Sequence, residues 1–302
     1  MGRRLWIGWI ACLAACAGAF GQGDGAGPLA IPALAGEPRS AFDPHARALH
    51  QFRRQHPHFQ TAIQVGEKLT YSVRFGPIRA GEATIEVPRR TVIEGDTCLH
   101  ILTTAESNNF FSTFFHVRDR IESFVTADLL QPRRFEKRLR EGDFRADMVV
   151  RFDPRNHLAV YDDGKIVEIL PGAHDILSAF FAVRARRMEP GDSFHLDCHA
   201  DRKNYPLRTD VLRRERIEVP AGTFDCLVLE PALRTPGLFK QEGTLTVWLS
   251  DDERRIPVQM KSKLAIGSIA AVLTDIAGRS DGRKADGSLS GGGSPPAASY
   301  EH

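Results

Sequence analysis

The sequence lacks several features that would assign it to a familiar functional class. Only five of its 302 residues are cysteines, and no apolar run approaches the roughly 20 residues that a membrane-spanning helix needs. Neither charge sign is in excess, with 40 Lys and Arg against 38 Asp and Glu. No phosphate-binding P-loop and no zinc-binding His-Glu-x-x-His motif is present. A nucleic-acid partner is not expected, because such proteins usually carry a basic excess.

The N-terminus has the pattern of a secretory signal. Two arginines precede the apolar run Leu5–Cys16, and small residues follow, so residues 1–19 are predicted to direct export. Within the run, Leu13–Cys16 fits a lipobox, which would make Cys16 the lipidated residue of an envelope lipoprotein. Ala17–Ala19 fits ordinary cleavage equally well, which would remove Cys16. Both interpretations place the mature chain in the periplasm, and Ala17 after the cysteine favours anchoring to the outer membrane.

Composition divides the rest of the chain into three parts. Residues 20–61 are rich in Gly, Ala and Pro and are predicted to form a flexible tether, with a short helix beginning at Asp43-Pro44. Residues 62–277 are long enough for one sizeable core. Residues 278–302 contain the Gly-Gly-Gly-Ser-Pro-Pro stretch and are predicted to be a disordered tail.

The central part alternates apolar and polar residues in about a dozen segments. In Lys68–Phe75 every second residue is apolar, and after a Gly-Pro turn the alternation resumes, which predicts a hairpin. Short connections predict antiparallel pairing. Ala173–Arg187 has helical spacing, with Asp175 as its N-cap, while Ser107–Phe115 is either a short helix or an irregular loop. We expect a mainly β fold of strongly curved antiparallel sheets, barrel-like or sandwich-like, with one central helix.

Eight short segments of the central part form a recognisable series along the chain. They are Gly66–Tyr71, Gly76–Gly81, Phe115–Ser123, Asp175–Ser178, Val219–Phe224, Trp248–Asp252, Arg255–Val258 and the segment from Lys263 to Leu273. In sequence and order, these segments resemble the bacterial DUF3108 family. The resemblance covers roughly residues 60–277 and implies an exported, strand-rich bacterial protein, but no reaction.

Three cysteines remain beyond the signal, namely Cys98, Cys198 and Cys226. An odd number permits at most one disulfide within the chain, and Cys198–Cys226 is the first candidate because both lie among the C-terminal strands. The alternative is that all three are buried free thiols.

One segment has metal-ligand residues at strand spacing. His195, Asp197 and His199 would project from one face of a strand, and two histidines with a carboxylate suit a divalent metal. No further ligand with matching spacing is visible. A solvated strand face therefore remains the favoured interpretation, and we expect no metal and no cofactor.

A charged strand supplies the candidate binding residues. Arg118, Arg120 and Glu122 would share one face, with Asp119 on the apolar face, where a carboxylate needs a partner. Arg138, Arg140 or Lys261 would supply that partner. The residues form either an anion or sugar pocket, in which arginine donates two hydrogen bonds, or an ion-pair network that braces a sheet. We favour the network.

The aromatic residues suggest a ligand. Phe114 and Phe115 belong to a phenylalanine-rich segment that would line the mouth of a half-closed barrel, where an acyl chain or a stacked glycan would fit. The first hypothesis is therefore a non-enzymatic envelope protein that binds an amphiphilic or glycan ligand. The alternatives are a polysaccharide hydrolase or lyase acting through carboxylates near Asp119 and Glu122, and a structural interaction module.

Overall fold

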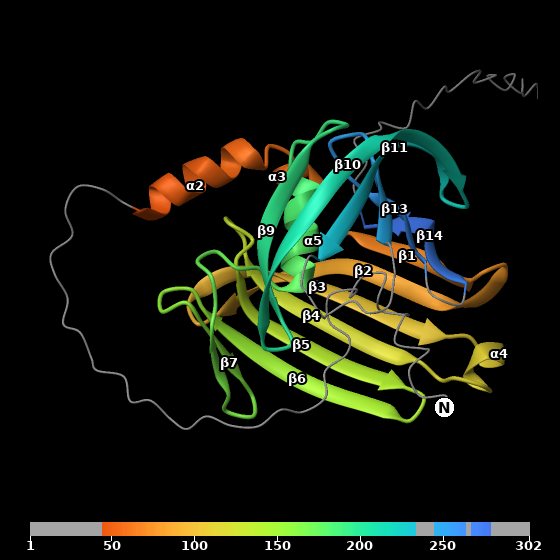
Figure 1. Cartoon of the computed structure of the whole chain (residues 1–302), viewed down its shortest axis with the longest axis horizontal. Coiled ribbons are helices and arrows are strands. Elements are labelled where there is room, and N and C mark those ends of the chain that lie inside the picture. The colour runs from red at the N-terminus through yellow and green to blue at the C-terminus, as the bar shows by residue number, and fades with distance from the viewer. Residues whose placement is uncertain (1–43, 234–244, 264–266, 279–302) are drawn as a thin grey trace, which may run out of the picture.

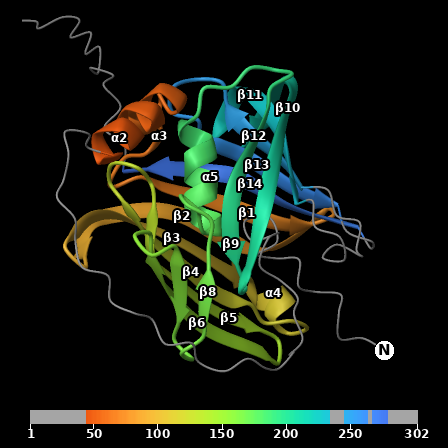
Figure 2. The ribbon, with the colours of Figure 1, turned by 60° about the vertical axis from the view of Figure 1, so that its left-hand side comes forward.

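The computed structural model of the chain describes residues 44–233, 245–263 and 267–278. Its main feature is one 14-stranded sheet in the order β8-β7-β6-β5-β4-β3-β2-β1-β14-β13-β12-β11-β10-β9, in which all neighbouring strands pair antiparallel (Figure 1). The sheet curves so far that its two halves face each other (Figure 2). The predicted fold class, mainly β with strongly curved antiparallel sheets and a central helix, is confirmed.

The helices and strands follow the order of the chain. The helices are α2 (Pro44–Gln55), α3 (Phe59–Ala62), α4 (Asn109–Ser112) and α5 (Ile176–Ala185). The strands are β1 (Lys68–Phe75), β2 (Ile78–Ile93), β3 (Asp96–Ser107), β4 (Arg118–Thr126), β5 (Pro132–Glu141), β6 (Phe144–Asp153), β7 (Leu158–Tyr161), β8 (Ile166–Glu168), β9 (Ser193–Ala200), β10 (Lys203–Val219), β11 (Gly222–Leu233), β12 (Leu245–Ser250), β13 (Pro257–Lys263) and β14 (Ser268–Ala277).

Helix α5 fills the space enclosed by the curved sheet (Figure 2). Nine of its ten residues are buried, so it is enclosed by the protein on nearly every side. The Asp175 carboxylate caps it by accepting the backbone N–H groups of Leu177 and Ser178, at 2.8 and 2.9 Å. The same carboxylate accepts the Ser123 hydroxyl of β4 at 2.5 Å, so the cap also attaches the helix to the sheet. None of the helices in the described residues is long and apolar enough to cross a membrane.

A fully buried ion pair anchors the other end of α5. The Arg184 guanidinium donates to Glu67 Oε1 at 2.8 Å, and the two side chains are 0% and 1% exposed. Arg184 also donates to the carbonyl oxygens of Ala62 at 2.8 Å and of Arg255 at 3.1 Å. One side chain therefore connects the helix to the segment before β1 and to the loop before β13.

The expected Cys198–Cys226 disulfide is absent, because all three cysteines of the described region are buried free thiols. Cys198 pairs with Tyr205 on one side of β10, while Cys226 pairs with Glu215 on the other side. Positions 205 and 215 are ten residues apart, or about 30 Å along a strand. That exceeds the roughly 7 Å that a disulfide can bridge.

The predicted signal (1–19), its Cys16 and nearly all of the predicted tail lie outside the described residues, as does most of the predicted tether. The tether's short helix corresponds to α2.

Candidate functional site

Edge strands β8 and β9 approach each other without pairing, and side chains join the sheet between them. We call these contacts the seam. Across it, Lys137 Nζ lies 2.6 Å from Asp201 Oδ1, Asn204 Nδ2 donates to the Glu168 carbonyl at 2.9 Å, and Arg202 pairs with Asp163. Asp201 and Arg202 form the β9–β10 turn, and both have left-handed backbone angles, with φ of 45° and 65°. The seam is thus held by side chains around a tight turn, and by two backbone hydrogen bonds between β9 and His174 in the segment after β8.

A chain of hydrogen bonds between uncharged groups also crosses the seam, and it runs through Tyr161, His199 and Asn204. The Tyr161 oxygen accepts the Arg202 backbone N–H at 2.7 Å, so its own hydrogen is available to His199 Nε2 at 2.8 Å. His199 Nδ1 then donates to Asn204 Oδ1 at 2.8 Å. This order requires neutral His199 with its proton on Nδ1. Burial lowers the pKa of His199 and therefore favours that form.

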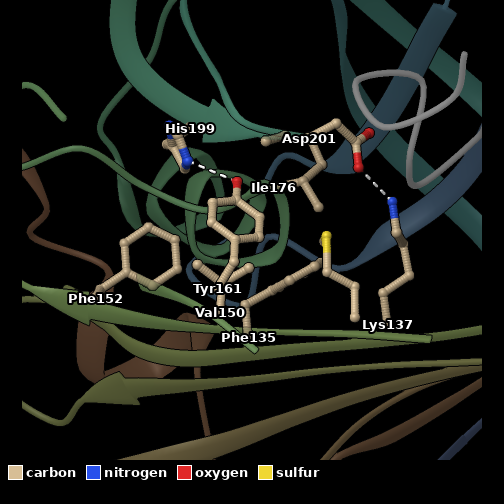
Figure 3. A pocket seen from close by; sticks show the side chains of 10 residues that line it. Phe135, Lys137, Val150, Phe152, Tyr161, Ile176, His199 and Asp201 are labelled. Carbon is tan, nitrogen blue, oxygen red and sulfur yellow. Dashed lines mark hydrogen bonds and ion pairs between the residues drawn. The ribbon is translucent and has the colours of Figure 1, made fainter. Parts of the chain in front are cut away.

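A small pocket lies directly behind the seam (Figure 3). Its walls are mainly apolar, and it has room for about one water molecule. The Lys137–Asp201 pair and the Tyr161–His199 hydrogen bond lie at its rim (Figure 3). The lining residues are Phe135, Lys137, Met148, Val150, Phe152, Tyr161, Ile176, His199, Ala200 and Asp201.

Strand β6 shows that the concave face of the sheet is only partly covered. Along its inward-facing residues, Phe144 is exposed, Ala146 and Met148 are half-buried, and Val150 and Phe152 are buried. On β5, Leu139 pairs with Ala146 and is also half-buried. We call Phe144, Ala146, Met148 and Leu139 the β6 strip. It forms a partly exposed apolar path that leads from the end of the β5–β6 hairpin to the pocket.

Two buried carboxyl groups, Asp119 and Glu141, interact on the same face of the sheet. Asp119 and Glu141 are 3% and 5% exposed and hydrogen bond to each other. Burial, with the neighbouring Glu141 carboxyl, raises the pKa of Asp119 to about 7, although Asp119 Oδ1 accepts the Arg140 backbone N–H at 2.7 Å. Burial also raises the pKa of Glu141. The expected arginine or lysine partner of Asp119 is therefore replaced by a backbone amide and a second carboxyl group.

The other predicted charged residues lie on the opposite face of β4 and β5. Glu122 binds Arg120 Nε and His100 Nε2, both at 2.7 Å. Although burial favours a higher pKa, these hydrogen bonds hold the pKa of Glu122 below its ordinary value. Arg138 contacts Glu136 at 3.3 Å, and Arg118 contacts Glu106 at 3.3 Å.

This arrangement is an ion-pair network on the outside of the sheet. Because Asp119 and Glu122 lie on opposite faces of one strand, they do not converge on a common substrate.

The predicted metal set is not brought together. His195 and Asp197 are exposed, whereas His199 is buried and uses both ring nitrogens in the seam. Among the described residues, no group of three or more His, Cys, Asp or Glu side chains is placed to hold a metal ion.

The aromatic candidates lie at one end of the sheet. Phe114 follows α4 and is 76% exposed, whereas Phe115 is half-buried and its ring lies against Gly142 of the β5–β6 turn. Neither lines the pocket.

Sequence reasoning missed the pocket residues Lys137, Asp201 and Tyr161. The sequence did contain a pattern that indicates Lys137, because it stands two residues from both Phe135 and Leu139 and therefore shares a strand face with these apolar residues. Asp201 and Tyr161 meet only because the edges of the sheet approach each other, which no local pattern reveals.

The chain was compared with known proteins. No curated protein gives a significant match. Among solved structures, a beta-barrel-like protein of the DUF1849 domain family from Brucella abortus is similar, with 9% identity, a TM-score of 0.49, and coverage of 72% of this chain and 99% of its own.

Two other solved structures are similar. A protein from Bacteroides fragilis with a YmcC-like fold, proposed to be exported, has 12% identity, a TM-score of 0.33, and coverage of 70% of this chain and 96% of its own. A proposed lipoprotein from Parabacteroides distasonis has 11% identity, a TM-score of 0.35, and coverage of 72% and 97%.

The family model described as protein of unknown function (DUF3108) matches residues 70–274, which include all the strands from β2 to β13 and most of β1 and β14. This chain therefore belongs to the DUF3108 family.

Proposed function

We propose that this protein is an exported, non-enzymatic envelope protein that binds the apolar part of an amphiphile along the β6 strip and in the pocket behind the seam. The signal-like N-terminus supports export to the periplasm, and Cys16 would tether the chain to the outer membrane. The observation that carries the binding proposal is the graded burial along β6 from exposed Phe144 to buried Phe152.

The pocket requires enlargement to accept an acyl chain, and the seam provides a route. Strands β8 and β9 are the two edges of the sheet and do not pair with each other. A short bridge of two backbone hydrogen bonds, at 2.8 and 2.7 Å, joins β9 to His174 in the segment after β8. The contacts to be broken are this bridge and the ion pairs and hydrogen bonds made by the side chains of Lys137, Tyr161, Arg202 and Asn204. The apolar walls behind them then become continuous with the β6 strip.

The charge of Lys137 indicates which ligand head group would bind beside the pocket. Its side chain is 7% exposed and lies between the strip and the pocket, with its ammonium group on Asp201. An anionic head group, such as a carboxylate or phosphate, replaces the Asp201 carboxylate without leaving the ammonium unpaired. The favoured ligand is therefore an anionic amphiphile.

The test is titration of the protein with a dansyl-labelled fatty acid, monitored by its emission. Ala146→Trp fills the β6 strip and is expected to weaken binding at least tenfold. Arg151→Trp places the same ring on the outer, exposed face of β6 and is expected to leave the affinity within twofold. Equal affinities for the two variants would overturn the proposal, as would no saturable binding to the unaltered protein.

A further inference from the structure

The connections β1–β2, β3–β4 and β5–β6 lie together at one end of the sheet (Figure 1), and exposed apolar side chains gather there. Phe110 is 62% exposed, Phe114 76% and Phe144 54%, and they are the only exposed phenylalanines among the described residues. Ile78 at the start of β2 is 49% exposed. We call these four residues the apolar tip.

The apolar tip is rigidly built. The Asn108 side chain caps α4 by accepting the Phe111 N–H at 2.8 Å, and it donates to the Arg79 carbonyl at 2.8 Å. Gly142 N–H donates to the His116 carbonyl at 2.7 Å, which joins the β5–β6 turn to the segment after α4. A Cβ atom at Gly142 would lie 2.8 Å from the Phe115 ring, and its φ is 55°. These contacts hold the exposed rings outward while Phe111 and Phe115 pack beneath them.

Arginines surround the tip. Arg74 donates to the Pro77 carbonyl, and Arg145 donates to the carbonyls of Gly142 and Phe144. In the part of the chain that the structure describes, neither arginine forms an ion pair within 4.0 Å, although exposed Asp143 lies in the same turn as Arg145. Both guanidinium groups therefore remain able to bind a phosphate oxygen while keeping their turn contacts.

We propose that the apolar tip inserts into the interfacial region of a phospholipid membrane. Protruding aromatic rings enter the boundary between head groups and acyl chains, and the adjacent Arg74 and Arg145 meet lipid phosphates. Exposed apolar side chains on three separate turns match a membrane interface, because lipid chains can fill the space between the turns. The three rings expose on the order of 300–400 Å² of apolar surface, an area typical of interaction sites.

The position of the predicted lipid anchor agrees with this partner. The described chain begins at Pro44, which is 28 residues after Cys16. Such a segment reaches at most about 95 Å. An anchored chain can therefore bring its apolar tip onto the same membrane.

Insertion is tested with vesicles of phosphatidylethanolamine and phosphatidylglycerol, using the full chain with Cys16→Ser so that lipidation contributes nothing. When vesicles are added, the fluorescence of the tryptophan in Phe114→Trp is expected to shift to the blue and to be quenched by brominated lipids. Leu212→Trp, at an exposed apolar site on β10, is expected to do neither. Unchanged emission from Phe114→Trp would overturn the proposal.

A second measurement compares binding between two triple variants. Replacing Phe110, Phe114 and Phe144 by serine is expected to lower the fraction bound to vesicles at least tenfold. Serine at Val92, Ile166 and Leu212 removes three exposed apolar residues elsewhere and is expected to leave binding within twofold. Equal loss in both variants would contradict insertion at the tip. Phe144 also belongs to the β6 strip, and phosphatidylglycerol is itself an anionic amphiphile, so Ala146→Trp is measured alongside. This variant fills the strip but leaves the tip intact, and it is expected to keep vesicle binding within twofold, which separates insertion at the tip from ligand binding along the strip.

Discussion

The buried Arg184–Glu67 pair makes the strongest prediction about stability. Arg184→Met keeps most of the volume but leaves the Glu67 carboxylate, which is 1% exposed, without its counter-charge. It also removes the hydrogen bonds to the Ala62 and Arg255 carbonyls. Removing one partner of a buried pair costs about 3–5 kcal/mol, against a total stability of about 5–15 kcal/mol for a typical domain.

Urea unfolding followed by circular dichroism measures this loss. With a slope of about 2–3 kcal/mol per molar urea, the midpoint is expected to fall by roughly 1–2 M with the slope unchanged. Adding Glu67→Gln to Arg184→Met removes the uncompensated charge and is expected to restore at least half of the loss. A loss below about 1 kcal/mol for Arg184→Met, or no recovery in the double variant, would refute the reasoning.

Three further predictions concern single residues. Because the pKa of Asp119 is raised to about 7, the folded state binds the proton more tightly than the unfolded state, so the free energy of unfolding should fall by about 2–4 kcal/mol as the pH rises from about 4 to 7. Asp119→Asn should flatten this pH dependence, measured by urea unfolding, whereas the surface control Asp143→Asn should keep it. The same pH dependence in both variants would contradict the assignment. Lys137→Met should weaken the binding of a fatty acid at least fivefold while leaving that of a neutral monoacylglycerol within twofold; an equal effect on both would exclude a role in head-group binding. Gly81→Ala should destabilise the protein by about 2 kcal/mol or more, measured by thermal unfolding, because its Cβ would lie 2.1 Å from the Glu106 carbonyl oxygen.

The local features of the fold followed from the sequence because they depend on neighbouring residues. Alternation in Lys68–Phe75 gave strand β1, and Asp175 marked the start of α5 because a carboxylate accepts the free N–H groups of a first turn. Gly81 belongs to a segment that resembles the family, and the structure supplies the physical reason, namely its close approach to β3.

The candidate site was less accessible because it depends on contacts between distant strands. Alternation placed Asp119 on the inward face, but nothing in the spacing showed that Glu141, rather than an arginine, would meet it. Lys137 and Asp201 are 64 residues apart and meet only where the curved sheet brings its two edges together. Cys198 and Cys226, which the sequence alone suggested as a pair, lie apart because they pair with positions ten residues apart on β10.

Native mass spectrometry of the protein purified from its own envelope tests the central claim most directly. The account predicts a bound amphiphile whose mass is lost on denaturation, and whose occupancy falls sharply in Ala146→Trp but not in Arg151→Trp. An unaltered protein that carries no such ligand, or an adduct that persists equally in Ala146→Trp, would contradict it.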